Sequence, residues 1–142
     1  MLDYLKREIS GKERKKVIRY MTQYRNLEAI IESKRMDLFP SHTVTYEERP
    51  SQSTNAFYSE AEEYAIAVAE IDEYVHVKRK LDLAYRSVKP VQRMIWDEHF
   101  IEGRNDIDIY NDYKNGITRR TYYREKGELI RVVAECLSIG TN

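Results

Sequence analysis

Four side chains near the C-terminal end of the sequence have the chemistry to bind phosphate and to contact base edges. They are Arg119, Arg120, Tyr123 and Arg124, in the stretch ITRRTYYREKGELIR. A guanidinium group binds phosphate oxygens, and it can donate two hydrogen bonds to a guanine edge in the major groove, which admits one α-helix. Arginine is also a good helix former on a solvated surface, and this simpler interpretation explains most charged helix faces.

Local signals place these side chains on a helix. Asn115 and Gly116 are residue types that tolerate positive φ in a tight turn, and the Thr118 hydroxyl can cap the first helical turn. We therefore expect a helix that starts at Thr118, continues to about Ser138 and is closed by Gly140.

The helical period of this stretch separates two faces. The solvent face carries Arg119, Arg120, Tyr123 and Arg124. Gly127 inside the helix costs up to about 1 kcal/mol relative to alanine, so the helix should depend on docking against the rest of the protein to be ordered. The inward face is apolar and consists of Ile117, Tyr122, Leu129, Ile130 and Val133.

Two further helices are expected just before this one. Pro90 suits the first turn of a helix over Val88 to Phe100, in which Val91, Met94, Ile95 and Phe100 face inward and Trp96, with His99 and Phe100, anchors the core. Asp106 would cap a short helix over Ile107 to Tyr113, and Lys114 to Gly116 would form a three-residue turn. Helix, short helix, turn and helix is the order of a helix-turn-helix, in which Lys114 and Thr118 would contact phosphates.

The N-terminal half predicts a long helical hairpin. Lys12 to Met36 contains neither Pro nor Gly and carries one apolar seam, and Ser59 to Ser87 carries a second. Residues 37 to 58 are rich in Pro, Ser and Thr, which favours a flexible loop; a short β-hairpin over residues 42 to 47 is the alternative. The seams consist of Val17, Tyr20, Tyr24, Leu27 and Ile31 in the first helix and of Ala61, Tyr64, Val68, Ile71 and Val75 in the second.

Charge is segregated along the chain although the net charge is zero. Residues 1 to 36 carry 10 basic and 5 acidic side chains, whereas residues 37 to 76 carry 1 and 9. Residues 114 to 131 carry 6 basic and 2 acidic side chains. The acidic first half of the second helix could therefore face the basic first helix, and a neutral total does not argue against nucleic-acid binding.

Length and composition narrow the remaining possibilities. A chain of 142 residues with 34% charged residues is typical of a helix-rich protein of one or two small units, and no apolar run is long enough to span a bilayer. No signal peptide is recognisable, so a cytoplasmic location is the default. The single cysteine, Cys136, lies in an apolar run and is expected to be a buried, inert thiol.

No cofactor, metal site or catalytic set is expected. The three histidines and the one cysteine lack metal-ligand spacing, and the glycine-rich phosphate loop is absent. Tyr122 or Tyr123, beside several arginines, could be a nucleophile for strand cleavage. Such a reaction also needs acids, bases and oxyanion donors, for which this short chain offers no obvious set.

Residues 87 to 138 resemble the region 4 module of sigma-70-type factors. The shared features are a proline-started helix, an acidic-glycine turn, a short helix, the Gly116-Ile117-Thr118 turn and a helix that begins with arginines. Asp112 stands where such modules usually have a small residue, and Tyr110 and Tyr113 suggest a turn one residue longer. The whole layout is similar to the RinA and ArpU family of phage late-gene transcriptional regulators.

The resemblance implies an all-α protein with two parts. Residues 1 to 86 would form a hairpin for oligomerisation or partner binding, with a flexible loop at 37 to 58, and residues 87 to 142 would form a DNA-binding helix-turn-helix. The protein would be a sequence-specific activator of phage packaging, structural or lysis genes. Its partners would be double-stranded DNA, RNA polymerase or a second copy of the chain, and no membrane. By resemblance, the residues aligned with DNA-contacting positions are Arg119, Arg120, Tyr123 and Arg124.

Two alternatives stay open. One is a helical interaction or assembly protein, in which the basic helix face is only solvated. The other is a small DNA-packaging subunit of the terminase type, in which a helix-turn-helix is joined to oligomerisation helices. DNA binding through several phosphates weakens steeply as salt rises, whereas an apolar interface does not.

Overall fold

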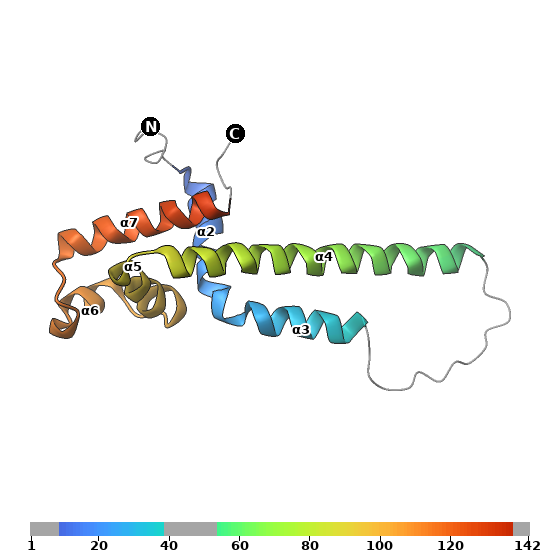
Figure 1. Cartoon of the computed structure of the whole chain (residues 1–142), viewed down its shortest axis with the longest axis horizontal. Coiled ribbons are helices and arrows are strands. Elements are labelled where there is room, and N and C mark those ends of the chain that lie inside the picture. Colours follow the sequence, from blue (N-terminus) through green and yellow to red (C-terminus); the bar gives the residue numbers. More distant parts are fainter. Residues whose placement is uncertain (1–8, 39–53, 138–142) are drawn as a thin grey trace. The chain divides into compact units, whose positions relative to one another are not determined.

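The computed structural model describes residues 9–38 and 54–137, and side chains for all of these except residues 54–58. Within these ranges all regular structure is helical, which confirms the all-α prediction (Figure 1). The helices are α2 (Gly11–Gln23), α3 (Leu27–Leu38), α4 (Thr54–Ser87), α5 (Pro90–Ile95), α6 (Asp106–Asn111) and α7 (Arg119–Cys136). Three short elements join them: the 3-10 turns η1 (Tyr24–Asn26) and η3 (Tyr113–Asn115) and the π-helix η2 (Trp96–Ile101). Within the described ranges, no helix is long and apolar enough to cross a membrane.

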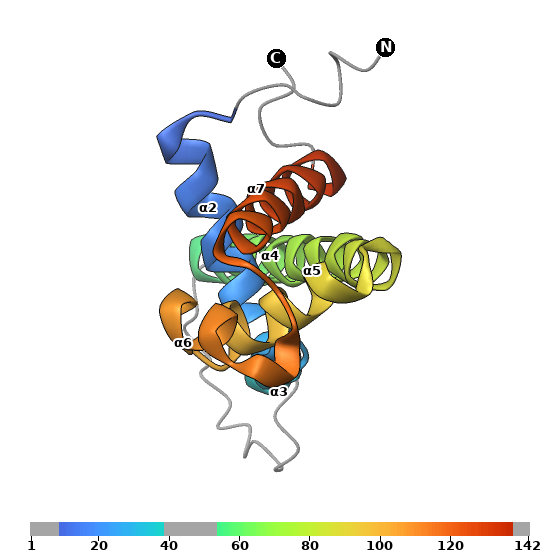
Figure 2. The same cartoon turned by 90° about the vertical axis from the view of Figure 1, so that its left-hand side faces the viewer.

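The chain forms two compact units, residues 1–25 with 78–142, and residues 26–77. In the first unit, α7 packs against α2, α5 and α6 (Figure 2). Because these helices contribute apolar side chains to one core, α7 is held in place along most of its length. The fully buried residues of this core include Val17, Met21, Leu81, Ile95, Trp96, Ile109, Tyr122, Leu129, Ile130 and Val133.

The helix predicted to be continuous from Lys12 to Met36 is interrupted close to its contact with Trp96. The structure interrupts it at η1, where the chain tightens from α to 3-10 geometry. The Met21 carbonyl accepts the backbone N–H of Tyr24 and the indole N–H of Trp96, at 3.1 Å. Since a buried indole N–H needs an acceptor, a helix carbonyl that is shared in this way satisfies Trp96 at the end of α2.

The segment predicted as one helix over Val88 to Phe100 consists of α5 followed by η2. Pro90 occupies the first turn, as expected, and Ile95, Trp96 and Phe100 are buried. Arg93 donates hydrogen bonds to the carbonyls of Tyr85 and Arg86, at 3.1 and 3.2 Å. These bonds satisfy carbonyls that the end of α4 leaves without helical partners, so they fix the corner between α4 and α5.

In the second unit, α3 contacts the middle of α4. Lys34 Nζ lies 3.0 Å from Glu70 Oε1 and 5.2 Å from the centre of the Tyr74 ring, while Leu38 lies near Ala67. Positions therefore rise along α3 as they fall along α4, which is antiparallel packing. Part of the predicted electrostatic pairing between the two helices is confirmed by the Lys34 to Glu70 pair.

Several other expectations are corrected or lie outside the described residues. The second helix begins at Thr54 and not at Ser59, and Ala61 and Tyr64 are exposed and not inside a seam. Cys136 is only half-buried, although burial raises the pKa of its thiol, which keeps it protonated and unreactive. The alternative β-hairpin at residues 42–47, most of the 37–58 loop and the predicted closing glycine at position 140 lie outside the described residues.

Candidate nucleic-acid interface

Asp106 has a different role from the predicted one. The residue before α6 in the capping position is Asn105, and Asp106 is the first residue of the helix. Its carboxylate instead accepts hydrogen bonds from the Tyr122 hydroxyl and from Lys126 Nζ, the latter at 2.9 and 3.0 Å. Asp106 therefore fixes α6 to the first two turns of α7.

The surroundings of Asp106 favour its charged form. Burial alone would raise the pKa of Asp106, but hydrogen bonds from Tyr122 and Lys126 outweigh it and hold that pKa below its ordinary value. Burial, and then the bond to Asp106, raise the pKa of Tyr122 well above its ordinary range. His99 Nδ1 donates to the Arg104 carbonyl at 2.8 Å and lies 3.3 Å from Asp106 Oδ1. The junction between α6 and α7 is thus a charged, hydrogen-bonded network.

The connection between α6 and α7 runs from Asp112 to Thr118, so the predicted three-residue turn is wrong. The short helix ends at Asn111 and not at Tyr113, and the 3-10 turn η3 follows it over Tyr113–Asn115. Asn115 Nδ2 donates to the Ile109 carbonyl at 2.9 Å, and Gly116 adopts φ 57°, the positive φ expected of this turn.

Arg104 secures the start of this connection. Its guanidinium lies 2.8 Å from Glu98 Oε1 and 3.2 Å from Asp112 Oδ2. The backbone N–H of Lys114 and the Arg104 guanidinium hold the pKa of Asp112 below its ordinary value. The Lys114 side chain itself is exposed and forms no ion pair with any residue that the structure describes.

Thr118 caps α7 as predicted. Its Oγ1 accepts the backbone N–H of Thr121 at 3.2 Å and donates to Thr121 Oγ1 at 3.0 Å. The first turn of α7 contains no acidic residue and begins instead with Arg119 and Arg120. Positive side chains lie unfavourably at the positive end of a helix dipole, and an anion at this end would be stabilised by both the arginines and the helix.

The four predicted recognition residues are all exposed on α7, as the helical period predicts. Tyr123 retains 42% of its accessible surface, and the Arg119 guanidinium lies 5.9 Å from the centre of its ring. Arg120 forms no hydrogen bond or ion pair within the described residues. Arg124 lies 3.7 Å from Glu125, a long contact in which the Arg124 side chain stays 66% exposed, so its guanidinium remains accessible.

Acidic groups of this region are occupied by internal partners. Glu125, which is 6% exposed, accepts a hydrogen bond from Gln92 Nε2 at 3.0 Å, and Lys89 lies 3.8 Å away. Asp106 and Asp112 are held by Lys126 and Arg104, as described above. Asp108 of α6 is an exception, because it is exposed with no partner among the described residues.

The sequence pattern did not identify Asp106 and Lys126 as positioning residues. A signal for them was present, because Tyr122 and Lys126 are four residues apart on one helix face and so can share an anionic partner. The same network bears on the alternative of a tyrosine nucleophile, because the Tyr122 ring is fully buried and its hydroxyl donates to Asp106. Tyr122 is therefore a structural residue of the α6–α7 junction.

The described residues contain no group of three or more His, Cys, Asp or Glu side chains that could hold a metal ion. The site consequently offers cationic and aromatic side chains around a helix N-terminus, an arrangement suited to binding anions. No family model matches the chain, and no curated protein or solved structure is significantly similar to it.

Proposed function

We propose that the protein binds double-stranded DNA sequence-specifically through α7, with α6, η3 and α7 acting as a helix-turn-helix. The observation that carries this proposal is the distribution of charge around α7. Arg119, Arg120 and Arg124 are exposed on one face, whereas most acidic side chains nearby are bound to internal cations. The surface that remains is positive, although the chain is neutral overall.

The roles of the side chains follow from their positions on α7. Arg119 and Arg120, in the first turn, would contact phosphates and base edges. Tyr123 and Arg124, one turn further, would reach the groove floor or the opposite backbone. Lys114 in η3 and Thr118 at the cap would contact phosphates; because the Thr118 hydroxyl proton is already donated to Thr121, Thr118 would act mainly through its backbone.

The biological part of the proposal rests on the resemblance to RinA- and ArpU-type regulators. In that role the protein would activate late phage genes, and the α3–α4 unit would join copies of the chain or contact RNA polymerase. Large apolar side chains support an interaction there, because Met36 and Ile66 are 68% and 63% exposed. Genome-wide mapping of bound DNA would test this role: sites upstream of late promoters agree with it, and sites confined to a packaging origin contradict it.

The DNA-binding step can be tested with the full-length protein. Selection from a random duplex library should enrich a defined sequence, and the Arg120→Ala, Arg124→Ala variant should lose affinity for it. Each bidentate contact to guanine contributes about 1 to 3 kcal/mol. Fluorescence anisotropy with the selected duplex measures the loss.

A matched control removes the same charge elsewhere. Arg79 and Lys80 of α4 form no ion pair among the described residues, so the Arg79→Ala, Lys80→Ala variant lowers the net charge equally. It should retain nearly wild-type affinity for the selected duplex. Equal losses for the two variants would mean that only net charge matters and would contradict recognition through α7.

A further inference from the structure

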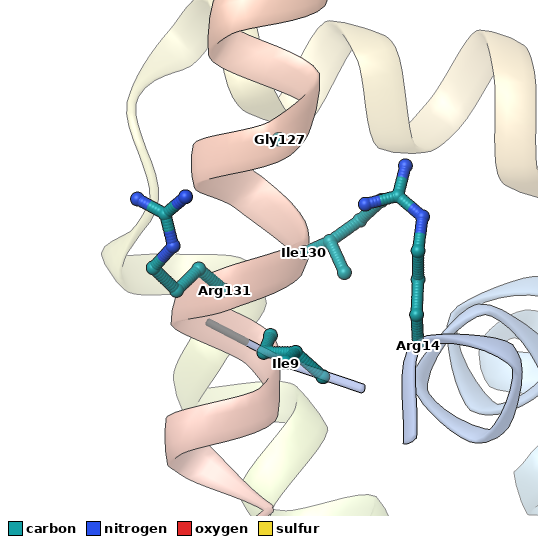
Figure 3. Close-up of a pocket in the computed structure, with 5 residues that line it drawn as sticks. All are labelled: Ile9, Arg14, Gly127, Ile130 and Arg131. Atoms are coloured by element: carbon teal, nitrogen blue, oxygen red, sulfur yellow. The ribbon is translucent and has the colours of Figure 1, made fainter. Parts of the chain in front are cut away.

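A hollow of about 190 Å³ lies beside the middle of α7, one turn and more beyond the recognition residues. It is lined by Ile9, Arg14, Gly127, Ile130 and Arg131, which come from the start of α2 and from the middle of α7. Figure 3 shows Arg14 and Arg131 on either side of Ile130, with no side chain at Gly127 to fill the space. Ile130 is fully buried, so the hollow has an apolar floor between two guanidinium groups.

Both arginines lack an acidic partner within the described ranges, 9–38 and 54–137. Two acidic groups close in sequence have other partners, and Glu135, four residues after Arg131, forms no ion pair within the described ranges. Glu13, the only acidic residue of α2, accepts the backbone N–H of Ser10 in the helix cap, and Glu128 of α7 pairs with Lys89. The hollow therefore combines two uncompensated positive charges with a space open enough for an anion.

The position of Arg131 on α7 connects this hollow to the recognition face. Arg120, Arg124, Gly127 and Arg131 follow at intervals of four, three and four residues, which places them on one stripe of the helix. With a rise of 1.5 Å per residue, Arg131 lies about 17 Å along the axis from Arg120. The major groove of B-DNA is only about 12 Å wide, so a helix that reads bases with its first turns has left the groove at that distance.

We infer that Arg14 and Arg131 bind backbone phosphates of the same DNA duplex, at the strand that borders the groove read by the start of α7. The inference rests on the proposed function and adds α2 to the DNA-binding surface. Exposed Lys12, Lys15 and Lys16 add further positive charge to α2. Arg14 and Arg131 supply affinity without sequence preference, whereas Arg120 and Arg124 supply discrimination.

The salt dependence of binding separates these two roles. For the wild type and for the Arg14→Ala, Arg131→Ala variant, the association constant is measured against salt with the selected duplex and with a scrambled one. The variant should lower affinity for both duplexes by the same factor, and the slope of log K against log salt should fall by about 0.9 for each phosphate that the variant no longer binds. The Arg120→Ala, Arg124→Ala variant should instead reduce the preference for the selected sequence.

Gly127 offers a pair of variants that differ only in charge. A Cβ added at Gly127 meets no atom within 4 Å, and Gly127 lines the hollow, so a side chain introduced here starts in open space beside the two arginines. Gly127→Glu should reduce affinity for both duplexes strongly, and Gly127→Gln, which has the same size, should reduce it much less. Circular dichroism of both variants verifies that α7 is retained.

The outcomes distinguish the inference from the function on which it rests. If the wild type binds no duplex, the proposed function and this inference both fail. If the wild type selects a sequence but the Arg14→Ala, Arg131→Ala variant keeps the wild-type salt slope, only the inference is overturned. Calorimetry with inorganic phosphate is the last measurement. Tight, saturable phosphate binding that is lost in the Arg14→Ala, Arg131→Ala variant, while the slope of log K against log salt for DNA stays unchanged, would identify a site for free phosphate. That result would also overturn the inference.

Discussion

The region around α7 and the α3–α4 unit differ in the sign of the charged side chains that remain exposed and unpaired. Around α7, acidic groups such as Asp106 and Asp112 are bound by internal cations, and Arg119 and Arg120 remain outside. In the α3–α4 unit, residues 26–77, the basic side chains Lys34 and Arg35 are each paired with an acidic one, Glu70 and Glu32. The exposed side chains of this unit that form no ion pair among the described residues are mostly acidic and include Glu60, Glu62, Glu63, Asp72 and Glu73.

This difference shows how a chain with zero net charge can present two surfaces of opposite sign. Around α7, internal ion pairs neutralise acidic groups, whereas the acidic surface of the α3–α4 unit follows mainly from composition, because residues 37 to 76 carry 9 acidic side chains and 1 basic one. Around α7 the neutralising bonds are also the ones that position the helix. Breaking them should therefore affect stability and binding together, whereas the exposed pair of the α3–α4 unit should affect neither strongly.

The largest effect is expected when Asp106 loses its carboxylate. Asp106→Ala leaves the Tyr122 hydroxyl and the Lys126 ammonium, whose side chain is 13% exposed, without their partner. Hydrogen bonds to charged groups contribute about 1.5 to 3 kcal/mol, so the free energy of unfolding should fall by about 2 to 3 kcal/mol. Urea unfolding measures the change. Asp108→Ala, in the same helix but exposed, is the control and should stay within about 0.5 kcal/mol of wild type.

Unfolding at acid pH tests the same hydrogen bonds, because protonation removes the charge of Asp106 and leaves its side chain in place. The pKa of Asp106 in the fold lies below its ordinary value of 3.8, so its stabilising contribution is complete above that pH. As pH falls through 3.8 and below, the unfolded chain binds the proton first and the contribution is lost. The difference in unfolding free energy between wild type and Asp106→Ala should shrink over this interval. A difference that stays constant down to about pH 2 would contradict the assigned role of the carboxylate.

The interiors of the two long helices differ in their glycine content. Gly127 lies inside α7, whereas α4 contains no glycine. A Cβ at Gly127 meets nothing within 4 Å, so Gly127→Ala should raise the free energy of unfolding by up to about 1 kcal/mol. The reverse change at an exposed alanine of α4, Ala69→Gly, should lower it by about the same amount. Thermal unfolding of both variants measures the two changes, and a loss of stability in Gly127→Ala would contradict the open space at this position.

The smallest effect is expected in the α3–α4 unit. Lys34 and Glu70 form an exposed pair, which raises the pKa of Lys34 but remains screened by solvent. Lys34→Ala should therefore change the free energy of unfolding far less than Asp106→Ala in the same urea experiment. Equal losses of unfolding free energy in Lys34→Ala and Asp106→Ala would contradict the view that the partly buried ion pair contributes more than the exposed one.

Local rules predicted much of the candidate site. The cap at Thr118, the positive φ at Gly116 and the exposure of Arg119, Arg120, Tyr123 and Arg124 depend on residues within one or two turns. The errors involve partners distant in sequence. Asp106 looked like a helix cap because its partners lie 16 and 20 residues away. The Met21 carbonyl, next to the break after Gln23, is bonded to Trp96, which lies 75 residues away. The DNA-binding role itself stays a prediction.

The hydrogen bond between Trp96 and Met21 also has a consequence for the order of events on the ribosome. Its two ends are 75 residues apart, and the indole is synthesised last. At a synthesis rate of about 5 to 20 residues per second, α2 waits about 4 to 15 s before its partner exists. During that interval the basic α2 is a nascent helix without the core that buries Val17 and Met21. A helix that is synthesised well before its partner is thus among the last to reach its final environment.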